Sequence, residues 1–180
     1  MPNERIKELI SEKEIAGRVT QLAELVDADY CGEQLTLVCV LKGAVIFMCD
    51  LAKKLKRSTV SIDFMDVSSY GAATESSGIV RIDKDIEDTI EGKNVLLVED
   101  IIDSGRTLAH VVRHLSLQNP KSLKVCTLLD KPERRAVSEI SPEYVGFTVP
   151  DHFVVGYGLD FDQRYRNLPY IGVLEFCEKI

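Results

Sequence analysis

Hydrophobic positions along the chain fall into short blocks whose spacing alternates between helical and strand-like. Helical spacing predicts helices at three places: residues 4–27 (one helix or two), 45–56 and 107–118. Continuous or alternating apolar runs predict strands over residues 35–41, 60–67, 79–82, 95–98, 123–129, 145–148, 153–156 and 171–174. The repeated order of strand, helix and strand predicts an α/β fold with a mostly parallel central sheet flanked by helices.

Composition narrows the class of protein. The 180 residues are typical of a single domain, which we expect to span residues 1–180. The net charge of −7 (22 Lys and Arg against 29 Asp and Glu) argues against nucleic-acid binding, which needs a basic face. Taken alone, it also argues against an anionic small-molecule substrate. The five cysteines lack CxxC spacing, which predicts free thiols. The sequence shows neither a signal-peptide core nor a membrane-length apolar stretch, so we expect a cytoplasmic protein with no membrane partner.

In parallel α/β sheets, ligands bind beyond the carboxyl ends of the strands, so the residues after each strand are the candidates for chemistry. The strand at 95–98 is followed by Glu99 and Asp100, then by Asp103 and the turn at 104–107 (SGRT), which opens a helix. Free N–H groups at a helix N-terminus, two hydroxyls and a glycine form a phosphate cradle. The spacing of a Walker A loop is absent.

The same turn has a purely structural interpretation, in which Asp103 or Ser104 only caps the helix. Three carboxylates beside a phosphate cradle are harder to explain in that way, because they repel an anion unless hydroxyls or a cation intervene. The combination favours a ligand that carries a phosphate, a diol and a bound divalent metal ion.

The segment VLLVEDIIDSGRT (95–107) resembles the phosphoribosyl-pyrophosphate binding motif of type I phosphoribosyltransferases. Four more segments resemble hypoxanthine phosphoribosyltransferases in order and spacing: residues 41–55 (LKGAVIFMCDLAKKL), 63–71 (DFMDVSSYG), 128–135 (LLDKPERR) and 149–174. The resemblance covers nearly the whole chain. It implies the type I phosphoribosyltransferase fold, with a small hood built from the N- and C-terminal segments and a mobile lid at about residues 68–78. By itself, that small, polar segment is typical of a disordered linker.

The resemblance assigns roles around the phosphoribosyl group. Glu99 and Asp100 resemble the acidic pair that holds the ribose hydroxyls, directly or through magnesium, and Asp103 resembles the residue that exchanges a proton with purine N7. The 5-phosphate loop is implied at Asp103, Ser104, Gly105, Arg106 and Thr107. The other implied positions are Lys42, Gly43 and Arg166 at pyrophosphate, Ser69 and Tyr70 in the lid, and Glu99, Asp100 and Asp160 as magnesium ligands. A cis peptide between Leu41 and Lys42 is also implied.

Three further residues resemble the purine site of the family. Lys131 resembles the lysine that donates a hydrogen bond to purine O6. Because an ammonium group has only donors, it can pair with a 6-oxo group but not with the 6-amino group of adenine. Phe153 resembles the aromatic that stacks on the base, and Val154 the residue whose backbone meets its edge; Asp160 belongs to the same segment. Without the resemblance, Lys131 is typical of a surface lysine and Phe153 of a core residue.

The resemblance implies a magnesium-dependent purine salvage enzyme. It would transfer the phosphoribosyl group from phosphoribosyl pyrophosphate to N9 of hypoxanthine, with guanine also accepted, as a homodimer or homotetramer. Two alternatives stay open: a guanine- or xanthine-preferring enzyme, and a non-catalytic nucleotide-responsive regulator on the same scaffold. The net charge of −7 and the retention of Lys42, Asp103 and Arg166 favour catalysis over the regulator.

Overall fold

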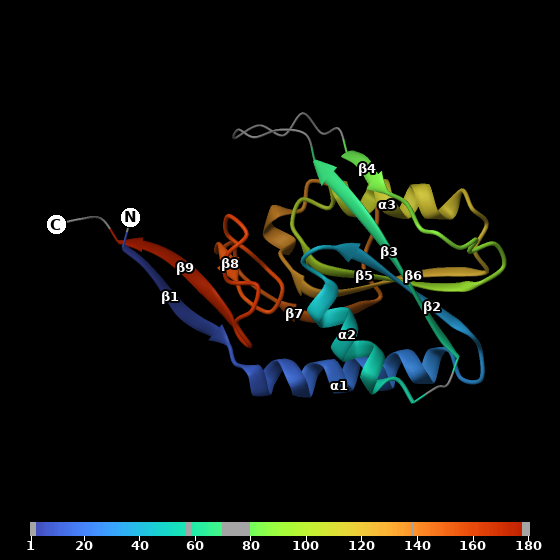
Figure 1. The fold of residues 1–180 in the computed structure, drawn as a ribbon, viewed down its shortest axis with the longest axis horizontal. Helices are drawn as coiled ribbons and strands as arrows, with labels where there is room; N and C mark the ends of the chain where they lie inside the picture. Colours follow the sequence, from blue (N-terminus) through green and yellow to red (C-terminus); the bar gives the residue numbers. More distant parts are fainter. Residues whose placement is uncertain (1–2, 57–58, 70–79, 138, 178–180) are drawn as a thin grey trace.

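The computed structural model describes residues 3–56, 59–69, 80–137 and 139–177 (Figure 1). Its strands are β1 (Asn3–Ile10), β2 (Leu35–Leu41), β3 (Val60–Ser69), β4 (Val80–Lys84), β5 (Asn94–Ile102), β6 (Ser122–Asp130), β7 (Tyr144–Thr148), β8 (Val154–Val155) and β9 (Ile171–Cys177). Its helices are α1 (Glu12–Asp29), α2 (Val45–Lys54), α3 (Arg106–Ser116) and the short 3-10 helix η1 (Pro132–Arg134).

Six strands form the central sheet, in the order β4-β3-β2-β5-β6-β7. β3, β2, β5, β6 and β7 run parallel, and only β4 is antiparallel to its neighbour within this sheet. This confirms the predicted α/β fold with a mostly parallel sheet. Because β2, β5 and β6 are adjacent and parallel, their carboxyl ends meet at one edge of the sheet, where ligands bind in such folds.

The central strands bury alternate residues against helices on opposite faces of the sheet. In β2, Leu37 and Cys39 pack with the α1 and α2 side, whereas Val38 and Val40 pack with the α3 side. Figure 1 shows α1 and α2 on one side of the sheet and α3 on the other. Burying each large aliphatic side chain stabilises the folded state by about 1.5–3 kcal/mol relative to leaving it exposed. The ends of β2 and β5 are therefore held from both faces, which gives a site at their tips a rigid base.

The chain's two terminal segments form a second sheet of three strands, in the order β1-β9-β8, which we call the hood. β1 pairs antiparallel with β9, so the two terminal strands lie side by side and extend from the body (Figure 1). The prediction of helix from residue 4 is wrong for residues 4–10. A capping box starts α1 only after Ser11: its hydroxyl accepts from the Glu14 N–H, and the Glu14 carboxylate accepts from the Ser11 N–H.

The other predicted elements are present with shifted bounds. The predicted strand at 95–98 extends to Ile102, so Glu99 and Asp100 belong to β5 itself. The predicted strand at 153–156 is only Val154–Val155. Most of the predicted lid, including Tyr70, lies outside the described residues, and the described part, residues 68–69, ends β3.

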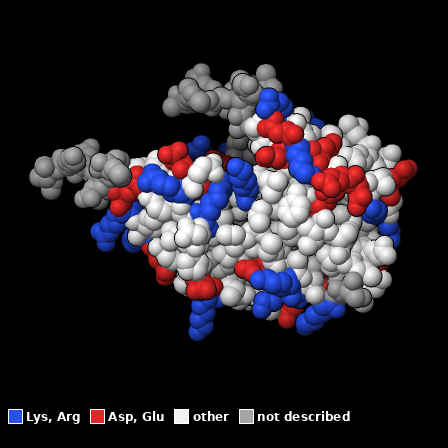
Figure 2. Space-filling view, in the orientation of Figure 1, with Lys and Arg blue, Asp and Glu red and all other residues white. Residues whose placement is uncertain are grey.

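The surface carries both signs of charge. On the face shown in Figure 2, basic and acidic side chains are interspersed, and no broad basic area of the kind that binds nucleic acid covers it. Among the described residues, no helix is long and apolar enough to cross a membrane.

Candidate active site

The carboxyl ends of β2, β5 and β6 border two adjoining cavities. The acidic cavity, of about 220 Å³, is lined by residues that include Leu41, Glu99, Asp100, Asp103, Ser104, Gly105 and Thr107. The Lys131 cavity, of about 390 Å³, is lined by Ile101, Asp103, Lys131, Arg134, Asp151, Phe153, Val154 and Leu159. Asp103 lines both, so it lies where ligands in the two cavities would meet.

Glu99 and Asp100 place two carboxyl groups at the buried end of β5. Glu99 is only 6% exposed, and burial together with the charge of Asp100 raises its pKa well above the usual value. Burial also raises the pKa of Asp100 to about 6, although the Ile101 N–H and the charge of Arg166 oppose this shift. Adjacent buried carboxyl groups of this kind suit a cation or the hydroxyl groups of a ligand.

The loop after β2 packs directly on this acidic pair. The Leu41–Lys42 peptide is cis, as the resemblance implied, and the Lys42 side chain is exposed. A Cβ at Gly43 would lie 1.6 Å from Oδ2 of Asp100, so only glycine leaves room for that carboxylate. A Cβ at Gly158 would in turn lie 2.0 Å from the carbonyl oxygen of Gly43. The loop after β2 therefore touches both the acidic pair and the loop after β8.

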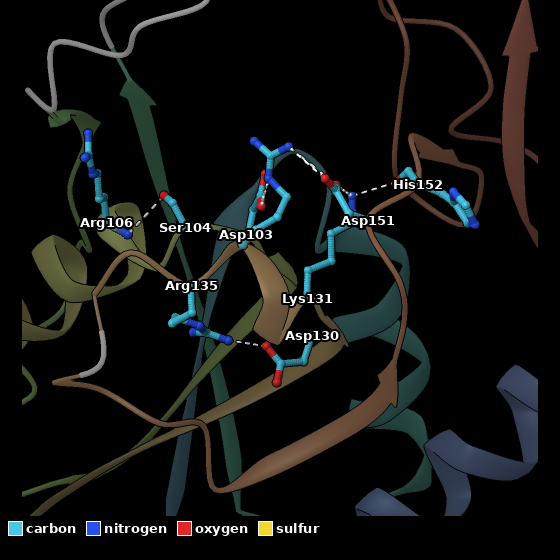
Figure 3. Close-up of polar contacts among 9 residues, drawn as sticks. Asp103, Ser104, Arg106, Asp130, Lys131, Arg135, Asp151 and His152 are labelled. Atoms are coloured by element: carbon cyan, nitrogen blue, oxygen red, sulfur yellow. Dashed lines mark hydrogen bonds and ion pairs between the residues drawn. The ribbon is translucent and has the colours of Figure 1, made fainter.

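The turn between β5 and α3 has the form of an anion cradle. Gly105, immediately before α3, has a φ of +81°, a conformation that favours glycine. The carbonyl of Ser104 accepts from the N–H groups of Ala136 (3.0 Å) and Val137 (3.2 Å), which hold the turn from behind. Gly105 has no side chain to cap α3, and the Arg106 N–H donates to the Ser104 hydroxyl at 3.4 Å, so the N–H groups that follow it in the first turn are the ones that can bind an anion. In Figure 3, Arg106 lies on the far side of Ser104 from Asp103.

The Lys131 cavity contains a buried ammonium group. Lys131 follows β6, and its side chain is 9% exposed. Its Nζ donates to the carbonyl of His152 (2.6 Å) and lies 3.7 Å from Oδ1 of Asp151 (Figure 3). Its backbone N–H donates to the carbonyl of Ile102 (2.9 Å), which ties it to the end of β5. The sequence's alternative of a surface lysine is therefore wrong for this residue.

Phe153 presents an aromatic ring at the mouth of the same cavity. It is 52% exposed, so it is not the core residue that sequence pattern alone suggests. The ring of Phe161 lies edge-on to it at 5.6 Å between centroids, and Phe176 of the hood packs on Phe161 at 5.4 Å. Val154, next in the chain, is buried in β8. A supported but exposed ring is suited to stack on a planar ligand.

Asp160 and Arg166 lie on the acidic side. Oδ1 of Asp160 is 2.7 Å from Nη2 of Arg166, and Nη1 of Arg166 donates to the carbonyl of Gly158 (2.7 Å). Both charges act on Asp100, since Arg166 lowers its pKa and Asp160 raises it. The structure therefore brings these two candidates close to the acidic pair.

The carboxylates have the donor chemistry of a magnesium site. Within the described ranges, no group of three or more His, Cys, Asp or Glu side chains gathers closely enough to hold a metal ion alone. Mg²⁺ usually takes one or two carboxylates, with waters and phosphate oxygens completing its octahedron. Glu99 and Asp100, with Asp160 separate from them, fit an ion that is bound together with a phosphate-bearing ligand.

Comparison with known proteins decides the family. Residues 6–162 match the family model described as the phosphoribosyl transferase domain. Hypoxanthine phosphoribosyltransferase of Buchnera aphidicola is 50% identical over 173 residues, which are 95% of this chain and 97% of that protein. The chain belongs to the hypoxanthine phosphoribosyltransferase family.

Two other relatives of this family support the assignment. A crystal structure of a hypoxanthine-guanine phosphoribosyltransferase from Bacillus anthracis, with a HEPES molecule in its active site, has a TM-score of 0.89 and 48% identity, covering 96% of this chain and 99% of that one. The bifunctional protein TilS/HprT of Listeria innocua is 52% identical over 175 residues. The match covers 97% of this chain but spans only 27% of that protein's length.

In this member of the hypoxanthine phosphoribosyltransferase family, sequence reasoning missed a group of charged residues beside Asp103. Nε of Arg134 lies 2.6 Å from Oδ1 of Asp103. Arg135 forms an ion pair with Asp130, and its Cδ would lie 3.1 Å from a Cβ at Gly105, so it packs behind the phosphate cradle. The signal available in the sequence is the charged run at 130–135.

Cavity size alone would have indicated a different place. A larger cavity, of about 590 Å³, lies between α1, α2 and residues 167–169. It contains neither the acidic pair nor the phosphate cradle. Chemistry rather than volume therefore identifies the site.

The contact between the two loops predicts the effect of a glycine substitution. Gly158→Ala puts a Cβ at a φ of +105° and 2.0 Å from the Gly43 carbonyl, a backbone atom that cannot rotate away. We expect it to lower the free energy of unfolding by about 1–3 kcal/mol in urea denaturation. The control is Gly17→Ala in α1, where nothing lies within 4 Å of the added Cβ. We expect that change to stabilise by about 0.5–1 kcal/mol. Equal stability of Gly158→Ala and the parent would contradict the loop contact.

Proposed function

We propose that the protein transfers the phosphoribosyl group from phosphoribosyl pyrophosphate to N9 of hypoxanthine, and also of guanine, giving IMP or GMP and pyrophosphate. The observation that carries the proposal is the pair of adjoining cavities that share Asp103. One has the groups for a diol, a phosphate and a cation. The other has the groups for a planar base that carries an oxo group.

In the acidic cavity, the proposed ligand is the phosphoribosyl group. Glu99 and Asp100 would accept hydrogen bonds from the ribose hydroxyls. The N–H groups at the start of α3, with the hydroxyls of Ser104 and Thr107, would bind the 5-phosphate, as anions bind at helix N-termini. Gly105, with its φ of +81°, makes the turn that precedes these N–H groups.

Pyrophosphate would lie beside the loop after β2. Lys42 and the backbone at Gly43 would neutralise it from one side, and Arg166 from the other. Magnesium, held by Glu99 and Asp100 and by Asp160, would supply further positive charge to the diphosphate when bound. Ser69 and Tyr70 would cover this part of the site and exclude water.

In the Lys131 cavity, the proposed ligand is a 6-oxopurine. Phe153 would stack on its face, and the backbone of Val154 would meet its edge. Lys131 would donate to O6. Since its ammonium group has no acceptor, it would leave the 6-amino group of adenine unpaired, which disfavours adenine.

The reaction would break the bond between ribose C1′ and the pyrophosphate oxygen and form a bond from C1′ to N9. The base would react as the tautomer protonated at N7, so one proton must leave as the C1′–N9 bond forms. Asp103, at the junction of the cavities, would accept this proton. The remaining residues would act by positioning and by neutralising charge.

Two alternatives are weaker but specific. A guanine- or xanthine-preferring enzyme would have the same site with different contacts at purine position 2. A nucleotide-responsive regulator would bind phosphoribosyl pyrophosphate without turnover, whereas Asp103, at the junction of the two cavities, suits the proton transfer that catalysis requires. We also propose a cytoplasmic homodimer or homotetramer with a single domain over residues 1–180.

A base panel tests the proposed function. Protein supplied with phosphoribosyl pyrophosphate and magnesium is assayed with hypoxanthine, guanine, xanthine and adenine. We expect the highest kcat/KM with hypoxanthine, appreciable turnover with guanine, and about 100-fold or greater discrimination against adenine. A higher kcat/KM with xanthine than with hypoxanthine would contradict the assignment of hypoxanthine as the preferred base. Binding of phosphoribosyl pyrophosphate without turnover on any base would support the regulator.

Removal of the buried ammonium tests the base site. Lys131→Ala should raise KM for hypoxanthine by about 10- to 100-fold, which is the loss of affinity expected when a hydrogen bond from a charged group is removed. It should also reduce the ratio of kcat/KM for hypoxanthine to kcat/KM for adenine. KM for phosphoribosyl pyrophosphate should change little. Lys121→Ala is the control, because Lys121 is 57% exposed and pairs with Glu33 away from the site. Base kinetics equal to those of the control would place Lys131 outside the purine site.

A further inference from the structure

Arg134 bridges two carboxylates at the boundary between the cavities. Its Nε lies 2.6 Å from Oδ1 of Asp103, and its Nη1 lies 3.3 Å from Oδ2 and 3.4 Å from Oδ1 of Asp151. The neighbouring charge of Asp103, followed by the hydrogen bond to Asp151, raises the pKa of Arg134. In Figure 3, the carboxylates of Asp103 and Asp151 lie near each other, and the end of the Lys131 side chain lies beside Asp151.

The pairing leaves one Asp103 oxygen for a ligand. Oδ1 is buried and has no hydrogen-bond partner among the described residues, so its 2.6 Å contact with Nε of Arg134 is an ion pair. In the part of the chain that the structure describes, no hydrogen bond reaches Oδ2. An aspartate held by one oxygen keeps its other oxygen at a defined place, in the way that an orienting partner fixes a catalytic base.

Arg134 is itself held by rigid backbone. It ends η1, whose Pro132 restricts the backbone at the start of the turn. The N–H of Arg134 donates to the carbonyl of Lys131 (3.1 Å), and the N–H of Lys131 donates to Ile102 in β5. At its other end the guanidinium is anchored by Asp151, which also lies 3.7 Å from Nζ of Lys131. One short segment therefore sets the positions of both Lys131 and Arg134.

Stability does not explain this arrangement. The side chains of Arg134, Asp103 and Asp151 are 50%, 45% and 45% exposed, and ion pairs between exposed groups contribute little to stability. The guanidinium instead defines direction, because its Nη1 donates to Asp151 while its Nε pairs with Asp103, and an ammonium group cannot reach two carboxylates in the same fixed plane.

We propose that Arg134 is a positioning residue that holds Oδ1 of Asp103 so that Oδ2 faces the purine N7, and that Asp151 anchors Arg134 in this role. The proposal rests on the proposed function. Arg134 does not touch the reacting atoms; it acts through Asp103. It therefore affects the proton-transfer step and not the binding of phosphoribosyl pyrophosphate.

A double-mutant cycle tests this coupling with four proteins: the parent, Asp103→Asn, Arg134→Gln and the double variant. We expect Arg134→Gln to lower kcat by about 10- to 100-fold, within the range that general acid–base catalysis contributes, with KM for phosphoribosyl pyrophosphate changed less than about 2-fold. In the Asp103→Asn background, the same substitution should change kcat by less than about 2-fold, since residues that act as a unit are not additive. Equal effects in both backgrounds would overturn the proposal.

Matched variants separate position from charge. Arg134→Lys keeps the charge without the fork and should recover only part of the lost kcat. Asp151→Asn should lower kcat less than Arg134→Gln does. Arg113→Gln is the control, because Arg113 on α3 pairs with Glu139 and both side chains are 66% exposed. Full recovery by Arg134→Lys would show that charge alone matters and would also overturn the proposal.

A readout that needs no turnover keeps the proposal distinct from the proposed function. Crystal structures of the parent and of Arg134→Gln should show the Asp103 carboxylate rotated away from its parent position in the variant. An unmoved Asp103 would overturn the positioning role, whether or not the protein turns over any base. Absence of turnover in the parent would contradict the proposed function alone.

Discussion

The burial of two adjacent carboxyl groups, Glu99 and Asp100, is the constraint on which the site depends. Taking ionised carboxyl groups out of water is costly, and here burial raises the pKa of both. The groups lie in the central strand β5, which helices cover on both faces, so they cannot turn outward to solvent. Such a pair is stabilised when it binds protons or when a ligand or cation compensates its charge.

The surrounding loops are shaped around this pair. Gly43 has no side chain because Asp100 occupies its space, and Gly158 has none because the Gly43 carbonyl does. Arg166, in the same loop as Gly158, brings a positive charge that lowers the pKa of Asp100. Beyond the acidic pair, Asp103 also lines the Lys131 cavity. There Lys131 provides an ammonium group and Phe153 an aromatic ring. The acidic pair, Asp103 and the Lys131 cavity thus follow one another along the sheet edge. In the proposed substrates, the ribose, the reacting C1′–N9 position and the base follow one another in the same order.

Much of this arrangement could be predicted from sequence. Continuous apolar runs identified the buried strands, and residues that follow parallel strands meet at one sheet edge whatever their distance in the chain. The pattern failed for residues 4–10, because Ile6, Leu9 and Ile10 fit a helix as well as a strand and the deciding partner, β9, is at the other end of the chain. The net charge of −7 failed as a guide to the ligand, since part of it is buried in the site.

The contacts of Arg134 could not be predicted in the same way. It is one of several charged residues in a short run, and nothing in that run specifies that its guanidinium lies between Asp103 and Asp151. That placement depends on η1 and on the path of the chain before β8. Individual ion pairs between separate segments require the fold itself, whereas strand-end motifs require only the strand order.

The most direct test of the central claim is a calorimetric titration of the protein with phosphoribosyl pyrophosphate, with and without magnesium. Because a buried acidic pair and a polyphosphate repel each other without a cation, we expect saturable binding with magnesium and binding at least about 100-fold weaker with a chelator present, a difference of about 2.7 kcal/mol. Equally tight binding without the metal ion would contradict the claim that Glu99 and Asp100 require a cation to bind this substrate.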